Sequence, residues 1–310
     1  MKIAIIIPCY NEQEVLPLTA PRIVALTERL KQEVDADTDV MFVDDGSRDN
    51  TWSLICQLSA EHTNMHGIRL SHNEGHQNAL WAGLETCVEH YNAMVTIDAD
   101  LQDDETVIID MARHVAQGKD IVYGVRKERT TDTIFKRSSA LLFYRIMQKV
   151  DKETVFNHAD FRMMTSRSVR ALLQYGERNL YLRGIVRMLG FNEAFVYYDR
   201  RKREAGESKY PFSKMLKFSV DGITSFSDAP LKWITFIGLS MTVVAFCIII
   251  YALYEHFSGK TLQGWTSMLV SMWFIGGIIT TGIGVVGVYI GKIYTEVKRR
   301  PRYFIQDRTK

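Results

Sequence analysis

The sequence contains few cysteines, lacks a leader-like start and has almost no excess of charge. Its four cysteines show no CxxC or other paired spacing, which argues against a zinc site or a disulfide framework and fits thiols kept reduced in a cytosol. The apolar run at residues 3–7 is short and closes at Pro8, so a signal peptide is not expected there. A net charge of only +2 gives no general preference for nucleic acid.

The chain nevertheless carries enough apolar material for a large core. It has 310 residues, of which 46% are hydrophobic and 24% charged, so disorder and small stapled scaffolds are excluded. This length predicts one large domain with an appendage. Charge and hydrophobicity are both segregated along the chain, and the average values hide that pattern.

Two uncharged stretches in the C-terminal third are long enough to cross a membrane. Residues 233–254 and 265–291 contain no charged side chain, and at ~1.5 Å per residue each spans a ~30 Å hydrocarbon layer. A buried hairpin in a soluble core is the alternative, disfavoured by the length of both runs. Cations outnumber anions from Lys292 onward, so the positive-inside rule predicts cytoplasmic termini and an external connector at residues 255–264.

Two further segments have the residue pattern of helices that lie in the membrane interface. Apolar residues recur at helical spacing in residues 212–226 and again in 135–150, typical of helices with one face among acyl chains. Packing on the protein's own core stays open as the other interpretation of both. Residues 200–217 and the tail from residue 292 are strongly basic, and their closeness to the spans favours anionic lipid over nucleic acid as the partner.

The N-terminal part alternates between strand-like and helix-like patterns. Apolar β-branched runs at residues 2–7, 40–43, 67–70, 93–97 and 120–123 are separated by helical patterns near 13–33, 50–61, 76–90 and 105–117. This order predicts an α/β fold with right-handed crossovers and a mostly parallel sheet. Ligands of such sheets gather beyond the carboxyl ends of the strands. A dinucleotide-binding fold is disfavoured because GxGxxG does not follow the first strand.

Polar and acidic turns follow three of these strands. Asp98 and Asp100 flank one residue after the fourth strand, and side chains at i and i+2 of an extended segment point the same way. With the Gln102 carbonyl they form a hard oxygen donor set suited to Mg²⁺ or Mn²⁺. A solvated, helix-capping turn is the common alternative. A second acidic turn, at Asp44 and Asp45, is expected at the same edge and favours the metal site.

Seven ordered motifs carry a resemblance to a known family. The segments PCYNE (8–12), VDDGS (43–47), NEG (73–75) and DADLQ (98–102) resemble family 2 glycosyltransferases with the GT-A fold, which is Rossmann-like. The segments HADFR (158–162), YLRG (181–184) and AGESKYP (205–211) resemble the polyprenyl-phosphate subgroup, which includes bactoprenol glucosyltransferases and dolichol-phosphate mannose synthases. The paired spans are similar to the bactoprenol type. The QxxRW motif of processive synthases is missing.

The resemblance implies a domain order and a set of site residues. It implies a GT-A catalytic domain at 1–199, a basic loop and juxtamembrane helix at 200–230, two spans within 231–291 and a basic cytoplasmic tail at 292–310. Roles implied by analogy are nucleotide-sugar binding by Pro8, Tyr10, Asn11, Glu12, Asp44, Asp98 and Ala99, metal binding by Asp98, Asp100 and Gln102, catalysis by Asp160 and Asp100, and binding of the acceptor phosphate by Arg126, Arg137, Arg162, Arg203, Ser208 and Lys209.

Some of these roles have alternatives. Asp160 is the family's candidate base, yet a structural ion pair with Arg162 is the other interpretation. The acceptor phosphate, with a second pKa of ~6, is already ionised near neutral pH, so Asp160 is also a candidate for orienting the acceptor. His76, Trp81 and His158 are interpreted as packing or loop residues.

The resemblance also implies a reaction, a cofactor and a location. The expected enzyme transfers one sugar, foremost glucose from UDP-glucose, to undecaprenyl phosphate at the cytoplasmic face of a bacterial inner membrane, with inversion and with Mg²⁺ or Mn²⁺. Other donors, namely GDP-mannose, UDP-N-acetylglucosamine and an aminoarabinose nucleotide, stay open, as does an inactive membrane scaffold. A homo-oligomer is expected, the family suggesting a tetramer, and no nucleic acid partner.

Overall fold

The computed structural model describes residues 1–309 except 101, 128–157, 179–181, 200–228 and 258–263. The chain forms two compact units: Met1–Gln148, Lys152–Phe212 and Arg300–Lys310 make the first, and Lys149–Asp151 with Ser213–Arg299 the second. Both predicted interfacial helices lie outside the described residues, as do four predicted acceptor-site residues: Arg137, Arg203, Ser208 and Lys209.

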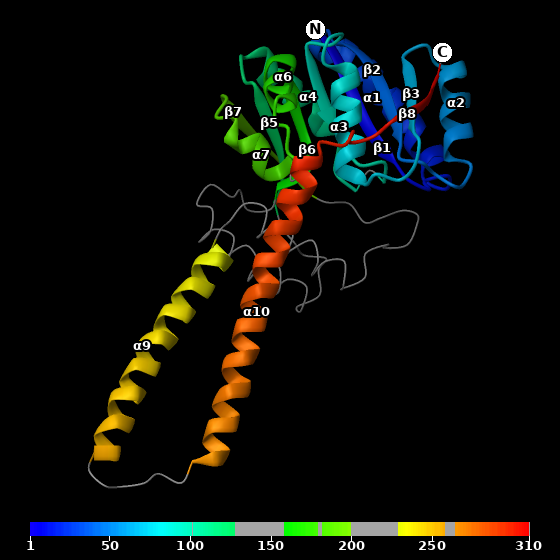
Figure 1. The fold of residues 1–310 in the computed structure, drawn as a ribbon. Helices are drawn as coiled ribbons and strands as arrows, with labels where there is room; N and C mark the ends of the chain where they lie inside the picture. Colours follow the sequence, from blue (N-terminus) through cyan, green and yellow to red (C-terminus); the bar gives the residue numbers. More distant parts are fainter. Residues whose placement is uncertain (101, 128–157, 179–181, 200–228, 258–263, 310) are drawn as a thin grey trace. The chain divides into compact units, whose positions relative to one another are not determined.

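The first unit is built on one sheet with the strand order β7-β5-β6-β4-β1-β2-β3-β8 (Figure 1). All its strands run parallel except β6 and β8. The five predicted strands are confirmed, and β6, β7 and β8 were not predicted. The strands are β1 (Lys2–Cys9), β2 (Asp37–Asp44), β3 (Met65–Leu70), β4 (Ala93–Thr96), β5 (Ile121–Arg126), β6 (His158–Thr165), β7 (Glu193–Tyr198) and β8 (Ile305–Arg308).

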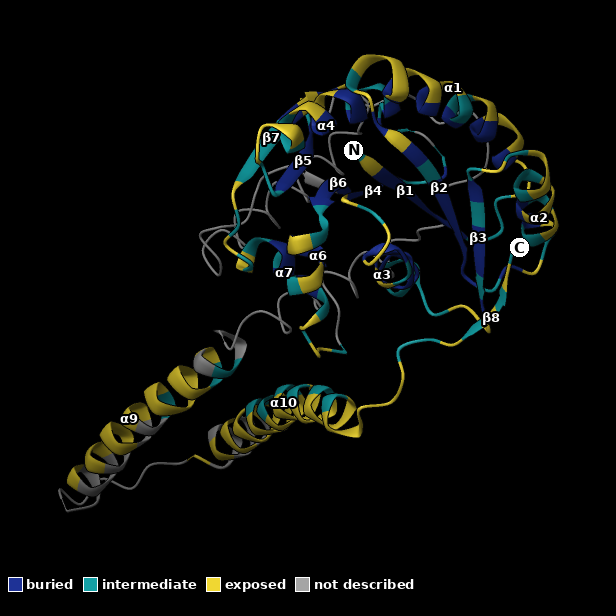
Figure 2. Cartoon of the chain, turned by 90° about the horizontal axis from the view of Figure 1, so that it is seen from above, coloured by how far each residue is buried: buried dark blue, intermediate teal, exposed yellow. Residues whose placement is uncertain are grey.

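Helices cover both faces of this sheet. α1, α2 and α4 lie on one face, and α3, α6 and α7 on the other (Figure 2). The four predicted helices are confirmed in α1 to α4, with the last one preceded by a 3₁₀ turn, η1. Their bounds are α1 (Leu16–Val34), α2 (Thr51–Glu61), α3 (His76–Cys87), η1 (Glu105–Val107), α4 (Ile108–Ala116), α6 (Ser166–Leu173) and α7 (Leu182–Met188).

Strand β1 is the centre of the core and is buried on both faces. Ile3, Ile5 and Ile7 lie in the main hydrophobic cluster with residues of α1 and α4, while Ile6 faces α3. A Cβ on Gly83 of α3 would lie 2.4 Å from the Ile6 Cγ2 atom, so glycine allows α3 to approach β1 this closely. An apolar strand buried on both sides is typical of a parallel sheet covered by helices.

The strand register brings the predicted turns to one edge of the sheet. Cys9 at the end of β1 pairs with Asp44 at the end of β2, and Ile6 pairs with Thr96 at the end of β4. The turns that follow these strands therefore leave the sheet at its carboxyl edge, where ligands of parallel sheets bind.

The segment after α10 adds the strand β8 to the sheet beside β3, on the side opposite β7. β8 pairs antiparallel with β3, and the Thr309 N–H donates to the Gly67 carbonyl at 2.9 Å. The Arg302 guanidinium lies 3.8 Å from the centre of the Trp81 ring and donates to the Tyr175 carbonyl at 2.7 Å. Part of the segment expected to be a basic tail is thus structural, because it occupies an edge that would otherwise carry unpaired backbone groups.

The second unit contains two long apolar helices, α9 (Ala229–Phe257) and α10 (Trp265–Lys298). Helix α10 begins where the second span was predicted and continues beyond residue 291 into the segment assigned to the tail. Within the described residues, Phe274–Lys298 is the one helical segment long and apolar enough to cross a membrane, and Trp233–Ile248 is a shorter apolar helix. The span predicted at residues 265–291 therefore overlaps a helix that is long and apolar enough to cross a membrane. The span predicted at residues 233–254 stays a prediction.

Candidate active site

The first two polar turns at the carboxyl edge are locked together by hydrogen bonds. The Asn11 N–H donates to the Ser47 hydroxyl at 2.9 Å, and the Asn11 side-chain oxygen accepts from the Arg48 N–H at 2.9 Å. The Glu12 N–H donates to the Thr51 hydroxyl at 2.8 Å. The predicted residues Asn11 and Glu12 therefore hold the segment after β1 against the segment after β2 at the carboxyl edge of the sheet, where ligands of parallel sheets bind.

Asp44, the predicted contact of the base, is fully buried at the end of β2. Its Oδ1 accepts from the Ser47 N–H at 3.0 Å, and its Oδ2 lies 3.2 Å from the Arg69 Nε. Burial raises the pKa of the Asp44 carboxyl, and the Ser47 hydrogen bonds and Arg69 oppose this rise. Arg69 was missed from the sequence. Its place on β3, the strand beside β2, was the available signal.

The neighbouring Asp45 ties the end of β2 to the loop that precedes α3. Its carboxylate accepts the Glu74 N–H at 2.8 Å and the Gly75 N–H at 2.9 Å. Burial raises the pKa of Asp45 to about 6, although both backbone hydrogen bonds oppose the rise. Position 46 requires glycine, because its φ is +65° and a Cβ there would lie 2.5 Å from the His72 carbonyl carbon.

The acidic turn after β4 contains the residues of the predicted metal site. The Gln102 N–H donates to the Asp100 Oδ1 at 3.2 Å, and the Ala99 carbonyl accepts the Thr19 hydroxyl at 2.6 Å. The pKa of Asp98 is raised first by burial and further by the nearby carboxylates Asp103, Asp100 and Asp160, while His76 opposes the rise.

This concentration of negative charge fits a divalent cation. Among the described residues no cluster of three or more His, Cys, Asp and Glu side chains suits a metal. The predicted set is smaller, with two carboxylates and one amide oxygen. Such a set matches Mg²⁺ or a similar ion that keeps water ligands and takes substrate phosphates to complete its shell.

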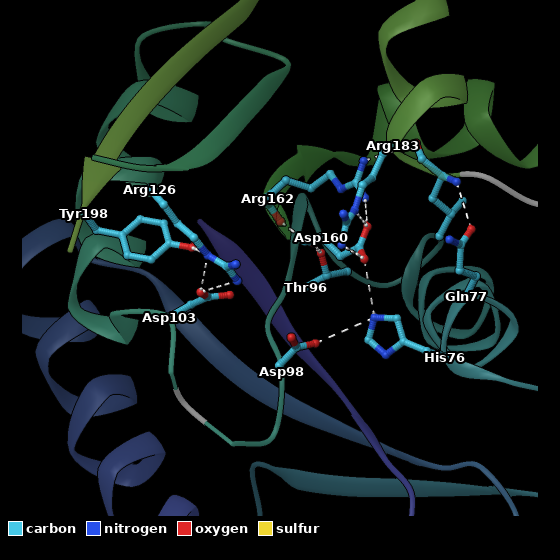
Figure 3. A network of polar contacts seen from close by, with 11 residues as sticks. His76, Gln77, Thr96, Asp98, Asp103, Arg126, Asp160, Arg162, Arg183 and Tyr198 are labelled. Atoms are coloured by element: carbon cyan, nitrogen blue, oxygen red, sulfur yellow. Dashed lines mark hydrogen bonds and ion pairs between the residues drawn. The ribbon is translucent and has the colours of Figure 1, made fainter. Parts of the chain in front are cut away.

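Asp160 on β6 lies beside this turn and is held by two arginines (Figure 3). Antiparallel pairing of Thr96 with Arg162 brings Asp160 level with the residues after β4. The Arg162 Nη2 donates to Asp160 Oδ1 at 2.8 Å, and Arg183 donates through Nε at 3.1 Å and Nη2 at 2.9 Å. Burial alone would raise the pKa of Asp160, but Arg183, His76 and Arg162 hold it well below its usual range.

The two arginines of this cluster differ in exposure. The Arg162 side chain is 3% exposed and also donates to the Leu182 carbonyl at 3.2 Å, whereas the Arg183 side chain is 29% exposed. The burial of Arg162 favours a role in holding Asp160 over the predicted contact with acceptor phosphate. Arg183 was not among the predicted site residues, although it lies in the YLRG motif.

His76 also belongs to this site, which corrects its interpretation as a packing or loop residue. Its Nε2 lies 3.6 Å from Asp98 Oδ1 and 3.6 Å from Asp160 Oδ2 (Figure 3). The next residue, Gln77, accepts the Leu182 N–H at 3.0 Å. The start of α3 therefore connects the acidic turn with the cluster around Asp160.

Arg126, a predicted acceptor residue, ends β5 at the same edge of the sheet. Its Nη2 donates to the buried Asp103 at 2.9 Å, and its Nε lies 3.3 Å from the Tyr198 hydroxyl. Although burial opposes it, Asp103 raises the pKa of Arg126. Asp103 thus balances the charge of Arg126, and the predicted contact of Arg126 with acceptor phosphate stays a prediction.

A mostly parallel α/β sheet with acidic turns and an arginine-rich cluster at its carboxyl edge defines a class of nucleotide-dependent transferases. The sequence profile described as "Glycosyl transferase family 2" matches residues 4–173. The chain therefore belongs to glycosyl transferase family 2, and it is a glycosyltransferase with the GT-A α/β fold.

Relatives match along the full length. The chain is 46% identical over 305 residues to "Uncharacterized glycosyltransferase YkoT" of Bacillus subtilis, covering 98% of this chain and 90% of that protein. It is 36% identical over 310 residues to "Bactoprenol glucosyl transferase" of Shigella phage SfX, covering 99% and 100% respectively. Among solved structures, S. aureus TarS 1–349 in complex with UDP matches with a TM-score of 0.45 and 16% identity, over 64% of this chain and 60% of that one.

Proposed function

We propose that this enzyme transfers one sugar from a nucleotide-sugar to a polyprenyl phosphate, with glucose from UDP-glucose and undecaprenyl phosphate as the first candidates. The observation that carries the proposal is that the acidic turn at Asp98 and the arginine-held Asp160 adjoin at one edge of the sheet (Figure 3). The name of the phage relative, matched over 99% of this chain, supports a bactoprenol acceptor and a glucose donor.

On the donor side, the interlocked turns would hold the nucleoside. Asp44 is fully buried and held by Ser47 and Arg69, so it would support the segment after β2 that faces the base. Asp98, Asp100 and Gln102 would hold a divalent cation, Mg²⁺ or Mn²⁺. When bound, such an ion offsets the negative charge that develops on the departing nucleoside diphosphate.

On the acceptor side, both reactants are anions and need nearby cations. The phosphate monoester is already largely ionised near neutral pH, so it needs positioning more than proton removal. Guanidinium groups suit phosphate oxygens, and Arg183 is the more exposed arginine beside Asp160. Asp160, with its lowered pKa, would orient Arg183 and the acceptor. A single in-line displacement would invert the anomeric carbon.

The lipid acceptor requires the site to work at a membrane surface. Phe274–Lys298 in α10 has the length and mean hydropathy of a spanning helix, and α9 is proposed as the other span. Basic residues at 200–217 and near Lys298 would face anionic headgroups, with the catalytic domain and both termini on the cytoplasmic side of a bacterial inner membrane. A homo-oligomer is part of the proposal.

A donor screen tests this function directly. Purified full-length protein would be given a short polyprenyl phosphate with radiolabelled UDP-glucose, GDP-mannose, UDP-N-acetylglucosamine or an aminoarabinose nucleotide, each with Mn²⁺. The expected result is one labelled lipid product, formed from UDP-glucose. A product from another donor changes the sugar but keeps the reaction class. No labelled lipid from any donor, in a preparation whose fold is verified, would overturn the proposal.

A further inference from the structure

We propose that His76 is a positioning residue that holds the Asp98 carboxylate for metal binding and couples it to Asp160. The inference rests on the proposed function, which supplies the roles of both carboxylates. Its geometric basis is that one atom, the His76 Nε2, lies 3.6 Å from Asp98 Oδ1 and 3.6 Å from Asp160 Oδ2. The imidazole therefore bridges the donor side and the acceptor side of the site.

The bridge has a specific consequence, because Nε2 carries one hydrogen at most. At 3.6 Å neither contact is yet a good hydrogen bond, and a small shift of either carboxylate brings it within hydrogen-bond distance. The N–H can complete that bond with one carboxylate at a time. A cation that draws an Asp98 oxygen away thus leaves the N–H available to Asp160, so the two halves of the site respond to each other.

The position of His76 is fixed by contacts on both sides of it in the chain. The Glu74 and Gly75 N–H groups are bound by the Asp45 carboxylate. Gln77 accepts the Leu182 N–H at 3.0 Å, and the Leu182 carbonyl accepts Arg162 at 3.2 Å. His76 is also the first residue of α3. These contacts fix the backbone from which the imidazole extends.

The two carboxylates depend on His76 unequally. Asp160 keeps contacts with Arg162 and Arg183 when the imidazole is removed. In the part of the chain that the structure describes, the ion pair of Asp98 is with His76. Loss of the imidazole should therefore disturb Asp98 more than Asp160, and the binding of metal is the property that should change.

The test is the affinity for Mn²⁺, measured by electron paramagnetic resonance on full-length protein in detergent with UDP present and no acceptor. Groups that orient a metal ligand typically contribute about 10-fold or more to affinity, so His76→Ala should raise the Mn²⁺ dissociation constant by about 10-fold. His76→Gln, whose side-chain N–H reaches a similar point, should recover most of the loss. The matched control is His72→Ala, which removes an exposed histidine that pairs with Glu74 at 2.9 Å and should leave Mn²⁺ affinity unchanged.

The outcomes separate this inference from the proposed function. If Asp98→Asn abolishes Mn²⁺ binding while His76→Ala leaves it unchanged, the role of His76 is overturned and the metal site stands. If Asp98→Asn leaves binding unchanged, the proposed metal site itself is overturned. An equal loss in His76→Ala and His76→Gln would indicate a general structural role and overturn the inference. Should His76→Ala not fold, tighter binding by His76→Gln than by the shorter His76→Asn is the expected result, and equal binding would overturn it.

Discussion

Arg183 donates two hydrogen bonds to the carboxylate of Asp160, from Nε to Oδ1 at 3.1 Å and from Nη2 to Oδ2 at 2.9 Å. Arg162 adds a third donor at 2.8 Å. A carboxylate whose pKa is held well below its usual range in this way is a weak proton acceptor. It is well suited to fixing the direction of a guanidinium group.

The pH dependence of catalysis should therefore follow the acceptor and not Asp160. We expect kcat/KM for the polyprenyl phosphate to fall on the acidic side of pH ~6, the second pKa of a phosphate monoester. Asp160→Asn should lower the rate and leave this acidic limb in place. The measurement is a pH–rate profile of both proteins at saturating donor. Disappearance of the limb in Asp160→Asn would instead identify Asp160 as the base.

Removal of either carboxylate of the acidic turn should abolish sugar transfer. Asp98→Asn or Asp100→Asn takes away a charged ligand proposed for the divalent cation, and a chelator should have the same effect on the wild type. Asp104→Asn is the matched control, because Asp104 caps η1 by accepting the Thr106 N–H at 3.1 Å. It should keep activity and lose little stability, because Asn caps a helix about as well as Asp. Full activity in folded Asp100→Asn protein would exclude the metal assignment.

Stability should fall as the pH rises through the pKa of Asp45. The folded pKa is about 6, above an unfolded value of ~3.9, so folding favours the protonated form. The stabilisation is complete below pH ~4 and is lost as pH rises to ~6, a difference of up to ~3 kcal/mol.

Asp45→Asn removes this titration and supplies the control. The difference in Tm between wild type and Asp45→Asn, measured in detergent at several pH values, should change across this window and be constant above it. A difference that is constant across the whole range would contradict the assignment.

The basic loop should contribute to binding of the lipid phosphate. Arg203 and Lys209 lie outside the described residues, so this prediction rests on the sequence resemblance. The double variant Arg203→Ala/Lys209→Ala should raise the KM for polyprenyl phosphate more than the KM for nucleotide-sugar, because cations offset the repulsion between the two anionic reactants. Steady-state kinetics with each substrate varied in turn gives both constants. Equal changes in the two would count against acceptor binding.

Arg302 should stabilise the catalytic unit although it follows α9 and α10 in the chain. Its guanidinium stacks 3.8 Å from the Trp81 ring centre and donates to the Tyr175 carbonyl. Arg302→Ala should therefore cost about 1–2 kcal/mol, measured as a lower Tm. Arg300→Ala changes an exposed arginine two residues away and should have little effect. Equal Tm values for the two variants would refute the contribution of the stacked arginine.

The parallel half of the fold could be predicted because its signals are local. β1 to β5 are apolar runs that end in turn residues, with helical patterns between them. β6 could not be found in this way, because it buries Asp160 and Arg162 and so reads as polar. The burial of Asp160 is compensated by Arg162 on the same strand and by Arg183 of α7.

The acidic turns of the site could be predicted from the sequence, whereas the roles of His76 and Arg69 could not. The acidic turns carry chemistry in their own residue types, and the family motifs add their order. His76 and Arg69 gain their roles from partners that the fold brings to them, Asp98 and Asp160 for the histidine and Asp44 for the arginine. No local pattern distinguishes such residues from ordinary surface ones.

The pairing of β8 with β3 also sets an order of assembly during synthesis. Ribosomes deliver the chain from its N-terminus, so β1 to β7 emerge before α9 and α10, and Ile305–Arg308 emerges after them. Until β8 has emerged, the backbone of β3 has an open margin that can pair with another chain. The sheet of the nascent enzyme can therefore close only after α9 and α10 have been synthesised.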